Sequence, residues 1–164
     1  DAQALFNLID SQREYLREWL SFVDLTREVD HTSLYLQSIL NSRTDKVFVI
    51  VVDDQVAGLI GYKGTEQYNA KTEIGYWLSE KCQGKGVMQQ CCRRLINYAF
   101  KDMRLNRVQL KIAPGNYKSL NIAHKLGFTL EGTEREGEFL NGRFQDLQVY
   151  SLLKSEWDDA KPFI

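Results

Sequence analysis

The segment EIGYWLSEKCQGKGVM, residues 73–88, decides the fold of this chain. Its first half is rich in aromatic and apolar residues and predicts a strand over residues 72–79. Gly84 and Gly86 then form a turn, after which apolar residues recur at helical spacing. Because the first N–H groups of a helix have no internal partner, such a turn can bind a phosphate group through backbone amides. A tight turn without a ligand is an equally good interpretation of the two glycines alone.

Helices and strands are predicted to alternate around this segment. Helices are expected over residues 2–20, over 34–40 with Thr32 as candidate N-cap, from Val87 to Phe100, and over about 120–126. Further strands are expected over residues 47–52, 56–62, 107–112, 128–140 and 143–153, with Asp53-Asp54 and Asn141-Gly142 as hairpin turns. The intervening helix makes strands 72–79 and 107–112 parallel. We therefore predict an α/β fold with a mixed sheet and flanking helices.

Length and composition indicate one folded domain. With 164 residues and no linker-like stretch, residues 1–164 are expected to form a single domain. The chain begins at Asp1 inside a helical pattern, so we expect an N-terminal segment, an edge strand included, to precede it. No apolar run approaches the roughly 20 residues that span a bilayer, so no membrane partner is expected. The 21 Lys and Arg residues balance 22 Asp and Glu residues, so no nucleic-acid partner is expected either.

Cysteines, histidines and nucleotide motifs exclude several classes of function. The three cysteines, Cys82, Cys91 and Cys92, suggest no disulfide framework, and we expect a reduced, cytoplasmic protein. His31 and His124 are far apart, so no metal site is expected. The chain has no G-x-x-x-x-G-K-[ST] motif and no G-x-G-x-x-G motif, which argues against P-loop and dinucleotide-binding functions.

Two blocks of sequence resemble the GNAT superfamily of N-acetyltransferases. Residues 83–88 are similar to the family's pyrophosphate loop, Q/R-x-x-G-x-G/A, except that Met88 takes the last position. Residues 116–128 are similar to the family segment N-x-x-S-x-x-x-A-x-x-x-G-F. Together with the closing hairpin, the chain resembles the RimL/RimJ branch over about residues 47–157, a branch that acetylates N-terminal amines of ribosomal proteins. The resemblance implies a mostly antiparallel sheet with one splayed parallel pair.

The resemblance also implies a binding site for acetyl-CoA as co-substrate. Backbone amides of the loop would hold the pyrophosphate, and the side-chain amide of Asn116 would face the pantetheine arm. Strand N–H groups near Tyr76, Trp77 and Leu78 would polarise the thioester carbonyl as its oxygen gains charge. The loop residues concerned are Gln83, Gly84, Lys85, Gly86, Val87 and Met88.

Acetyl transfer to an amine requires a base for the ammonium proton and a donor for the leaving thiolate. The tyrosine that often supplies the donor in this family is replaced by Ala123. In the RimL-type pattern the donor corresponds to Ser119 and the base to Glu138. Two alternatives for the base stay open, Glu73 and an ordered water. Ser119 could instead cap a helix, and Glu138 could be an exposed strand residue.

The acceptor amine is predicted less sharply than the acetyl donor, acetyl-CoA. A protein N-terminus, a ribosomal protein above all, is the first expectation. A small amine such as a polyamine, an amino acid or an aminoglycoside is the alternative, since acidic residues are frequent between 131 and 138. A CoA-binding module without catalysis is a third hypothesis. Because this family often pairs through its terminal strands, a homodimer is a further expectation.

Overall fold

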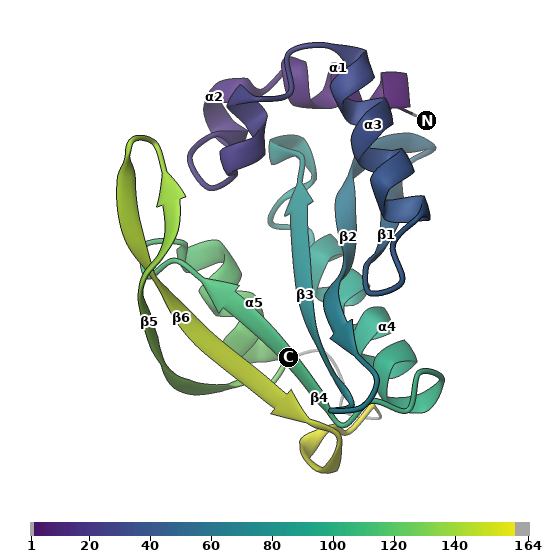
Figure 1. The fold of residues 1–164 in the computed structure, drawn as a ribbon, viewed down its shortest axis with the longest axis vertical. Coiled ribbons are helices and arrows are strands. Elements are labelled where there is room, and N and C mark those ends of the chain that lie inside the picture. Colours follow the sequence, from purple (N-terminus) through teal and green to yellow (C-terminus); the bar gives the residue numbers. More distant parts are fainter. Residues whose placement is uncertain (1, 160–164) are drawn as a thin grey trace.

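The structure, a computed structural model, describes residues 2–159. These residues build a six-stranded sheet in the order β1-β2-β3-β4-β6-β5 (Figure 1). The strands are β1 (Lys46–Val52), β2 (Gln55–Glu66), β3 (Lys71–Leu78), β4 (Arg107–Ile112), β5 (Thr129–Leu140) and β6 (Arg143–Leu153). The pair β3–β4 is parallel and the other neighbours are antiparallel, which confirms the predicted mixed sheet.

Two-residue turns produce both predicted hairpins. Asp53 and Asp54 have φ values of 49° and 60°, and Asn141 and Gly142 have φ values of 52° and 77°. Positive φ at both central residues matches the twist of the adjoining strands, and Asn, Asp and Gly tolerate it best. The hairpins β1–β2 and β5–β6 are therefore determined locally, by the turn residues themselves.

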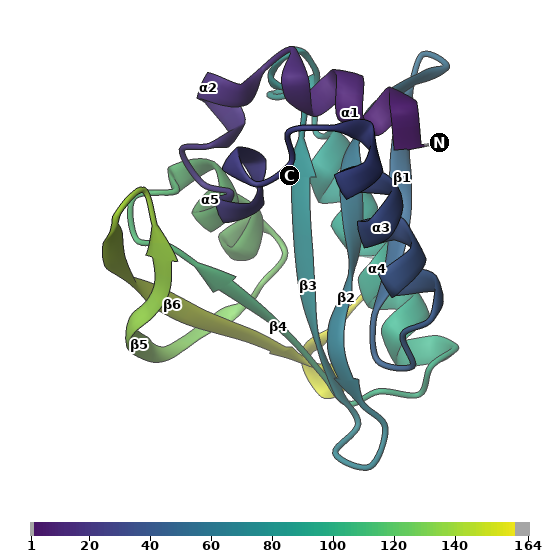
Figure 2. The same ribbon diagram turned by 45° about the horizontal axis from the view of Figure 1, so that its top comes forward.

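The sheet opens between β3 and β4. These strands pair over three residues each, in the register Lys71↔Arg107, Thr72↔Val108 and Glu73↔Gln109. Beyond Glu73 they diverge toward their carboxyl ends, as Figures 1 and 2 show. On their outer sides β3 stays paired with β2 as far as Leu78, and β4 with β6 as far as Ile112. The expected splayed parallel pair is thus present.

The helices cover opposite faces of the sheet. They are α1 (Ala2–Asp10), α2 (Arg13–Leu16), α3 (Val29–Leu40), α4 (Val87–Lys101) and α5 (Tyr117–Lys125), with short 3-10 turns η1 (Ser21–Asp24), η2 (Glu80–Cys82) and η3 (Lys154–Glu156). In Figures 1 and 2, α3 lies in front of β1 and β2 and α4 lies behind, while α1 crosses the upper end of the sheet and packs on the same face as α3. Trp77 is buried in the front core with Leu5 and Leu59, whereas Ile74 and Leu78 are buried in the larger core under α4.

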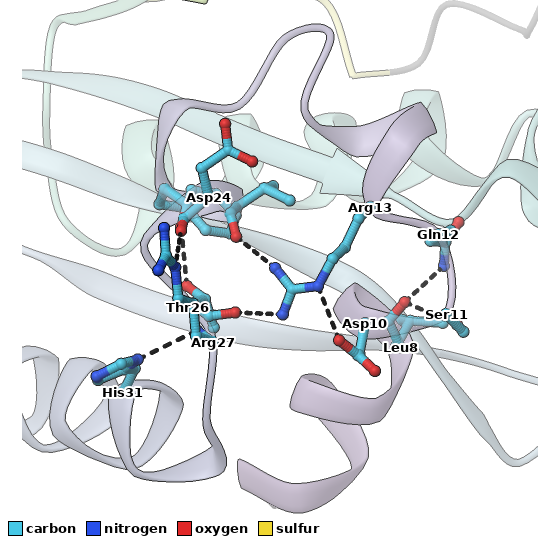
Figure 3. Close-up of polar contacts among 11 residues, drawn as sticks. Leu8, Asp10, Ser11, Gln12, Arg13, Asp24, Thr26, Arg27 and His31 are labelled. Carbon is cyan, nitrogen blue, oxygen red and sulfur yellow. Dashed lines mark hydrogen bonds and ion pairs between the residues drawn. The ribbon is translucent and has the colours of Figure 1, made fainter.

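The expected helix over residues 2–20 is broken in the structure. It divides into α1 and α2, and the chain after α2 turns back toward Arg13. The Arg13 guanidinium donates to the backbone carbonyls of Val23 and Thr26 and to Asp10 (Figure 3). These bonds can form only when the chain reverses direction between Arg13 and residue 23. A helix that continued to residue 20 would hold the carbonyls out of reach of the guanidinium.

Two further helix boundaries differ from expectation. The helix expected from residue 34 begins at Val29 and has Glu28 as its N-cap, so Thr32 lies inside α3 and is buried. The helix expected from about residue 120 begins at Tyr117, because Asn116 caps it. No helix in the described part of the chain is long and apolar enough to cross a membrane. Within residues 2–159, no group of three or more His, Cys, Asp or Glu side chains could hold a metal ion.

Candidate functional site

The glycine turn leaves the first amides of α4 open. Gly84 and Gly86 have φ values of 71° and 74°, and Gly86 is the N-cap of α4 without a side-chain cap bond. Left-handed backbone costs other residues roughly 1–2 kcal/mol, so glycine suits both positions. Met88 is buried in the core, so its larger side chain points away from the turn. The predicted loop therefore offers uncapped N–H groups at the positive end of a 15-residue helix, which suits a phosphate group.

Two of the three predicted strand amides face the gap between β3 and β4. The N–H of Ser79 donates to Ala57 of β2 at 2.7 Å. Because hydrogen-bonding direction alternates along a strand, the N–H of Trp77 also faces β2, whereas those of Tyr76 and Leu78 face the gap. The prediction for Trp77 is therefore corrected, because its side chain is buried in the core and its amide faces β2 instead of the gap. Tyr76 and Leu78 keep donors for a ligand in the gap.

Asn116, rather than Ser119, caps α5. The Asn116 side-chain oxygen accepts from the Ser119 N–H at 3.2 Å. Ser119 is thus the third helical residue, and the capping role suggested for its hydroxyl falls to Asn116. Ser119 is half-buried on the turn that precedes Ala123, which is fully buried. Residues four apart share a helix face, so Ser119 points toward the interior.

Replacing Asn116 by Ala should lower the free energy of unfolding by about 1 kcal/mol, since a cap bond is lost. The melting temperature should fall by roughly 2–4 °C in a domain of this size. Ser119→Ala is the matched control and should leave the melting temperature unchanged. An equal loss in both variants would show that Ser119 takes part in capping.

The Tyr76 side chain reaches from β3 into the core between α4 and α5. Its hydroxyl is buried and has no hydrogen-bond partner among the described residues. Burial, and next the proximity of Cys92, raise the pKa of Tyr76, and the nearby Ser119 side chain lowers it in part. The Ser119 hydroxyl is thus close to the phenol, although the two do not form a hydrogen bond of ordinary geometry. An unpartnered buried hydroxyl costs about 1–3 kcal/mol.

The register of β6 places Glu138 on the β5–β6 hairpin, beyond the carboxyl end of β4. Gln148 of β6 pairs with Ile112, the last residue of β4. Gln145 lies three residues further along β6, beyond the end of β4, and pairs with Glu138 of β5. Its amide donates to the Glu138 carboxylate at 2.8 Å, and both side chains are half-buried. Glu138 therefore lies beyond the carboxyl end of β4, at which β3 and β4 have diverged.

The alternative base, Glu73, lies at the closed end of the gap. It pairs in register with Gln109, whose side-chain amide donates to it at 3.2 Å. Leu78 is five residues further along β3, which is roughly 16 Å in an extended strand. Glu73 therefore lies three residues before Tyr76 and five before Leu78, on the part of β3 that is still paired with β4.

Two other carboxylates of β5 are neutralised by cations of β4. Arg107 donates to both oxygens of Glu131 at 2.6 Å, and this pairing, with a smaller contribution from Ser151, lowers the pKa of Glu131 to about 2. Lys111 lies 2.7 Å from Glu134, which raises the pKa of Lys111. Glu131 and Glu134 are therefore neutralised, whereas Glu136 and Glu138 of the same strand form no ion pair with Lys or Arg among the described residues.

Residues 12–19 reach the loop before α4, a contact that the sequence analysis missed. The Gln12 side-chain oxygen accepts from the Glu80 N–H at 3.0 Å. The Tyr15 hydroxyl accepts from the side chain of Gln83, the first residue of the loop motif. Burial, followed by the nearby carboxylates of Glu80 and Glu18, raises the pKa of Tyr15. Gln83 therefore anchors the loop to α2 rather than extending outward.

The same segment contacts the other wall of the gap and the hairpin. The Lys118 ammonium of α5 lies 5.2 Å from the centre of the Tyr15 ring. The Trp19 ring packs so closely on Gly115 that an added Cβ would lie 3.2 Å from it. The Asn141 side chain donates to the Arg17 carbonyl at 3.1 Å, which ties the β5–β6 hairpin to this end. No spacing signal could predict these contacts, because the partners are 68 or more residues apart.

The sequence profile of the acetyltransferase (GNAT) domain matches residues 1–129. These residues include the glycine loop, the N-termini of α4 and α5, and the splayed strands β3 and β4. The chain belongs to the GNAT acetyltransferase family. It is an acetyl-CoA-dependent N-acetyltransferase. The matched residues end before Glu138, so the profile says nothing about the hairpin that carries it.

Similar proteins support the RimL-like branch of this acetyltransferase family. YdaF of Bacillus subtilis, named provisionally as a ribosomal N-acetyltransferase, is 36% identical over 98% of this chain and 90% of its own length. The ribosomal-protein-serine acetyltransferase of Escherichia coli is 31% identical over 91% of this chain and 85% of its own. A solved structure of RimL, a ribosomal L7/L12 α-N-protein acetyltransferase with bound coenzyme A, has a TM-score of 0.88 at 26% identity, covering 93% and 88% of the two chains.

The open end of this acetyltransferase fits its co-substrate. The uncapped amides at Gly86 and beyond suit a diphosphate, and the Tyr76 and Leu78 amides face the gap that would receive the thioester. The Asn116 oxygen accepts the hydrogen bond of the helix cap, and the NH₂ group of the same side chain can donate to a ligand.

Proposed function

We propose that this acetyltransferase acetylates the N-terminal amine of a protein, a ribosomal protein above all, in the cytoplasm. The observation that carries the proposal is the environment of the Glu138 carboxylate, which has no cation partner among the described residues. It is half-buried beyond the carboxyl end of β4 and accepts from the uncharged Gln145 amide, whereas Glu131 and Glu134 of the same strand are paired with cations. The names of YdaF, the Escherichia coli relative and RimL support a protein acceptor.

Each group has one role in the proposed reaction. The Glu138 carboxylate receives the proton that the acceptor ammonium loses, directly or through a water. The free amine then attacks the acetyl carbonyl carbon, and the Tyr76 and Leu78 amides donate to its oxygen as charge develops. As the carbon–sulfur bond breaks, the Ser119 hydroxyl donates a hydrogen bond to the sulfur, and the thiolate takes up the proton that the nitrogen loses as it becomes the amide. The products are an acetylated amine and CoA.

A small polyamine fits this site less well. A polycationic acceptor is bound best by several unpaired carboxylates, whereas Glu131 and Glu134 are already in ion pairs. The acceptor is identified by an assay with acetyl-CoA and either N-terminal peptides or spermidine. Peptide acetylation is expected to give the higher kcat/KM, and a higher value with spermidine would overturn the proposed acceptor.

Acetyl-CoA should stabilise the protein in a thermal-shift titration. At about 100 times its dissociation constant it adds about 2.7 kcal/mol to the free energy of unfolding, because it binds only the folded chain. In a domain of this size this corresponds to several degrees. ATP and NADH, which carry phosphates but no pantetheine, are the controls. The site assignment fails if they raise the melting temperature as much as acetyl-CoA does.

A further inference from the structure

The Tyr76 hydroxyl is a buried polar group that the proposed mechanism leaves without a use. It extends from β3, beyond the last residue that pairs with β4, toward the first turn of α5. It has no hydrogen-bond partner among the described residues. Buried hydroxyls in proteins are nearly always bonded, so an exception calls for an explanation.

Tyr62 shows what a purely structural tyrosine looks like in the same core. It lies on the neighbouring strand β2, is fully buried, and packs against α4 as Tyr76 does. Its hydroxyl donates to the Leu95 carbonyl at 2.6 Å. The core under α4 therefore can offer a hydrogen-bond acceptor to a tyrosine hydroxyl. It offers none to the hydroxyl of Tyr76.

The side chains that lie near the Tyr76 hydroxyl are those of Cys92 on α4 and Ser119 on α5, and of these the serine is the better hydrogen-bond acceptor. The two residues come from opposite walls of the gap, Tyr76 from β3 and Ser119 from α5. A serine hydroxyl can accept one hydrogen bond while it donates another. A phenol beside it is therefore well placed to donate to the serine oxygen while the serine proton points elsewhere.

We propose that Tyr76 is a positioning residue for Ser119. Its hydroxyl donates a hydrogen bond to the Ser119 oxygen when Ser119 turns its own proton toward the CoA sulfur. The inference rests on the role proposed above for Ser119. Tyr76 keeps its proton throughout, because burial disfavours the phenolate, so no proton is transferred through it. The bond to Tyr76 makes Ser119 a stronger donor, since hydrogen bonds in a chain polarise one another.

The test titrates the thiol of CoA bound to the protein, followed by the ultraviolet absorbance of the thiolate. A donor near the sulfur stabilises the thiolate and lowers the pKa of the bound thiol. Ser119→Ala and Tyr76→Phe should each reduce the thiolate fraction at a fixed pH by about two- to tenfold, the factor that one hydrogen bond of ordinary strength is worth.

The double variant tests whether Tyr76 acts through Ser119. With Ser119 already replaced by Ala, Tyr76→Phe should have no further effect on the bound thiol. An equal reduction in both backgrounds would show that Tyr76 acts on the sulfur independently and would overturn the inference. The inference would be overturned as well if Tyr76→Phe caused no reduction in the protein that retains Ser119.

Tyr62→Phe is the matched control for folding. It removes a real hydrogen bond and should lower the melting temperature, but it should not change the titration of the bound thiol. Tyr76→Phe should show the reverse pattern, with an unchanged or raised melting temperature, because its hydroxyl has no partner to lose. A fall in melting temperature as large as that of Tyr62→Phe would point to a structural role for Tyr76.

The two proposals fail in different ways. The thiol titration needs only bound CoA, so it does not depend on the identity of the acceptor amine. If Ser119→Ala leaves the bound thiol unchanged, the donor role of Ser119 is wrong and the inference falls with it. If Ser119→Ala changes it and Tyr76→Phe does not, only the inference about Tyr76 is wrong.

Discussion

Glu138→Gln is expected to lower kcat about 10²- to 10⁴-fold, the range over which a general base contributes. Glutamine keeps the shape of the side chain and can still pair with Gln145, so the hairpin should fold normally. At the pH of the assay the variant can no longer take up the ammonium proton. The measurement is the steady-state rate with saturating acetyl-CoA and the best N-terminal peptide.

Glu73→Gln is the matched control for this prediction. Glu73 also accepts a hydrogen bond from a glutamine side chain, but it lies where β3 and β4 are still paired. Its kcat should stay within about twofold of the parent value. If Glu73→Gln causes the large loss and Glu138→Gln does not, the two carboxylates have been assigned the wrong way round. If neither variant loses activity, a water must take the proton without either carboxylate.

Gly58→Ala is expected to have the largest effect on stability. A Cβ at Gly58 would lie 2.2 Å from the Trp77 carbonyl oxygen and 3.0 Å from the Leu78 Cα, which are backbone atoms of β3. Neither can move without separating β2 from β3, so we expect a loss of about 3 kcal/mol or more in the free energy of unfolding. Denaturant unfolding measures it. Since Leu78 carries one of the amides that face the gap, affinity for acetyl-CoA should fall too.

Gly132→Ala is the control, because an added Cβ there meets no atom within 4 Å and the backbone has no positive φ. Its midpoint of unfolding should be nearly that of the parent. A tolerated Gly58→Ala would mean that β2 and β3 can separate locally at low cost, and that the geometry of the open end is less constrained than the register implies.

Local signals predicted most of the sheet. The turns at Asp53-Asp54 and Asn141-Gly142 have the positive φ values that their residue types favour, and both hairpins follow from them. The apolar face of α4 was also predicted, since Cys92, Ile96 and Phe100 recur at helical spacing and are buried. These features are carried by residues within a few positions of one another.

Long-range contacts determined the elements that were predicted wrongly. The helix expected over residues 2–20 ends at Leu16, and the chain turns back so that the Arg13 side chain bonds to carbonyls ten and thirteen residues away. Ser119 was the candidate helix cap, and only the path of the chain out of β4 made Asn116 the cap instead.

The sequence by itself determined the family, the two motif blocks, the loop that suits a phosphate and the pair Ser119 and Glu138 as candidates. Only the tertiary structure separated Glu138 from Glu73, turned the Trp77 amide toward β2, and brought Tyr76 to Ser119 across the gap. The physical reason is that backbone conformation and helix periodicity depend on near neighbours, whereas the direction of an amide and the partner of a buried hydroxyl depend on strand register and on which elements pack together.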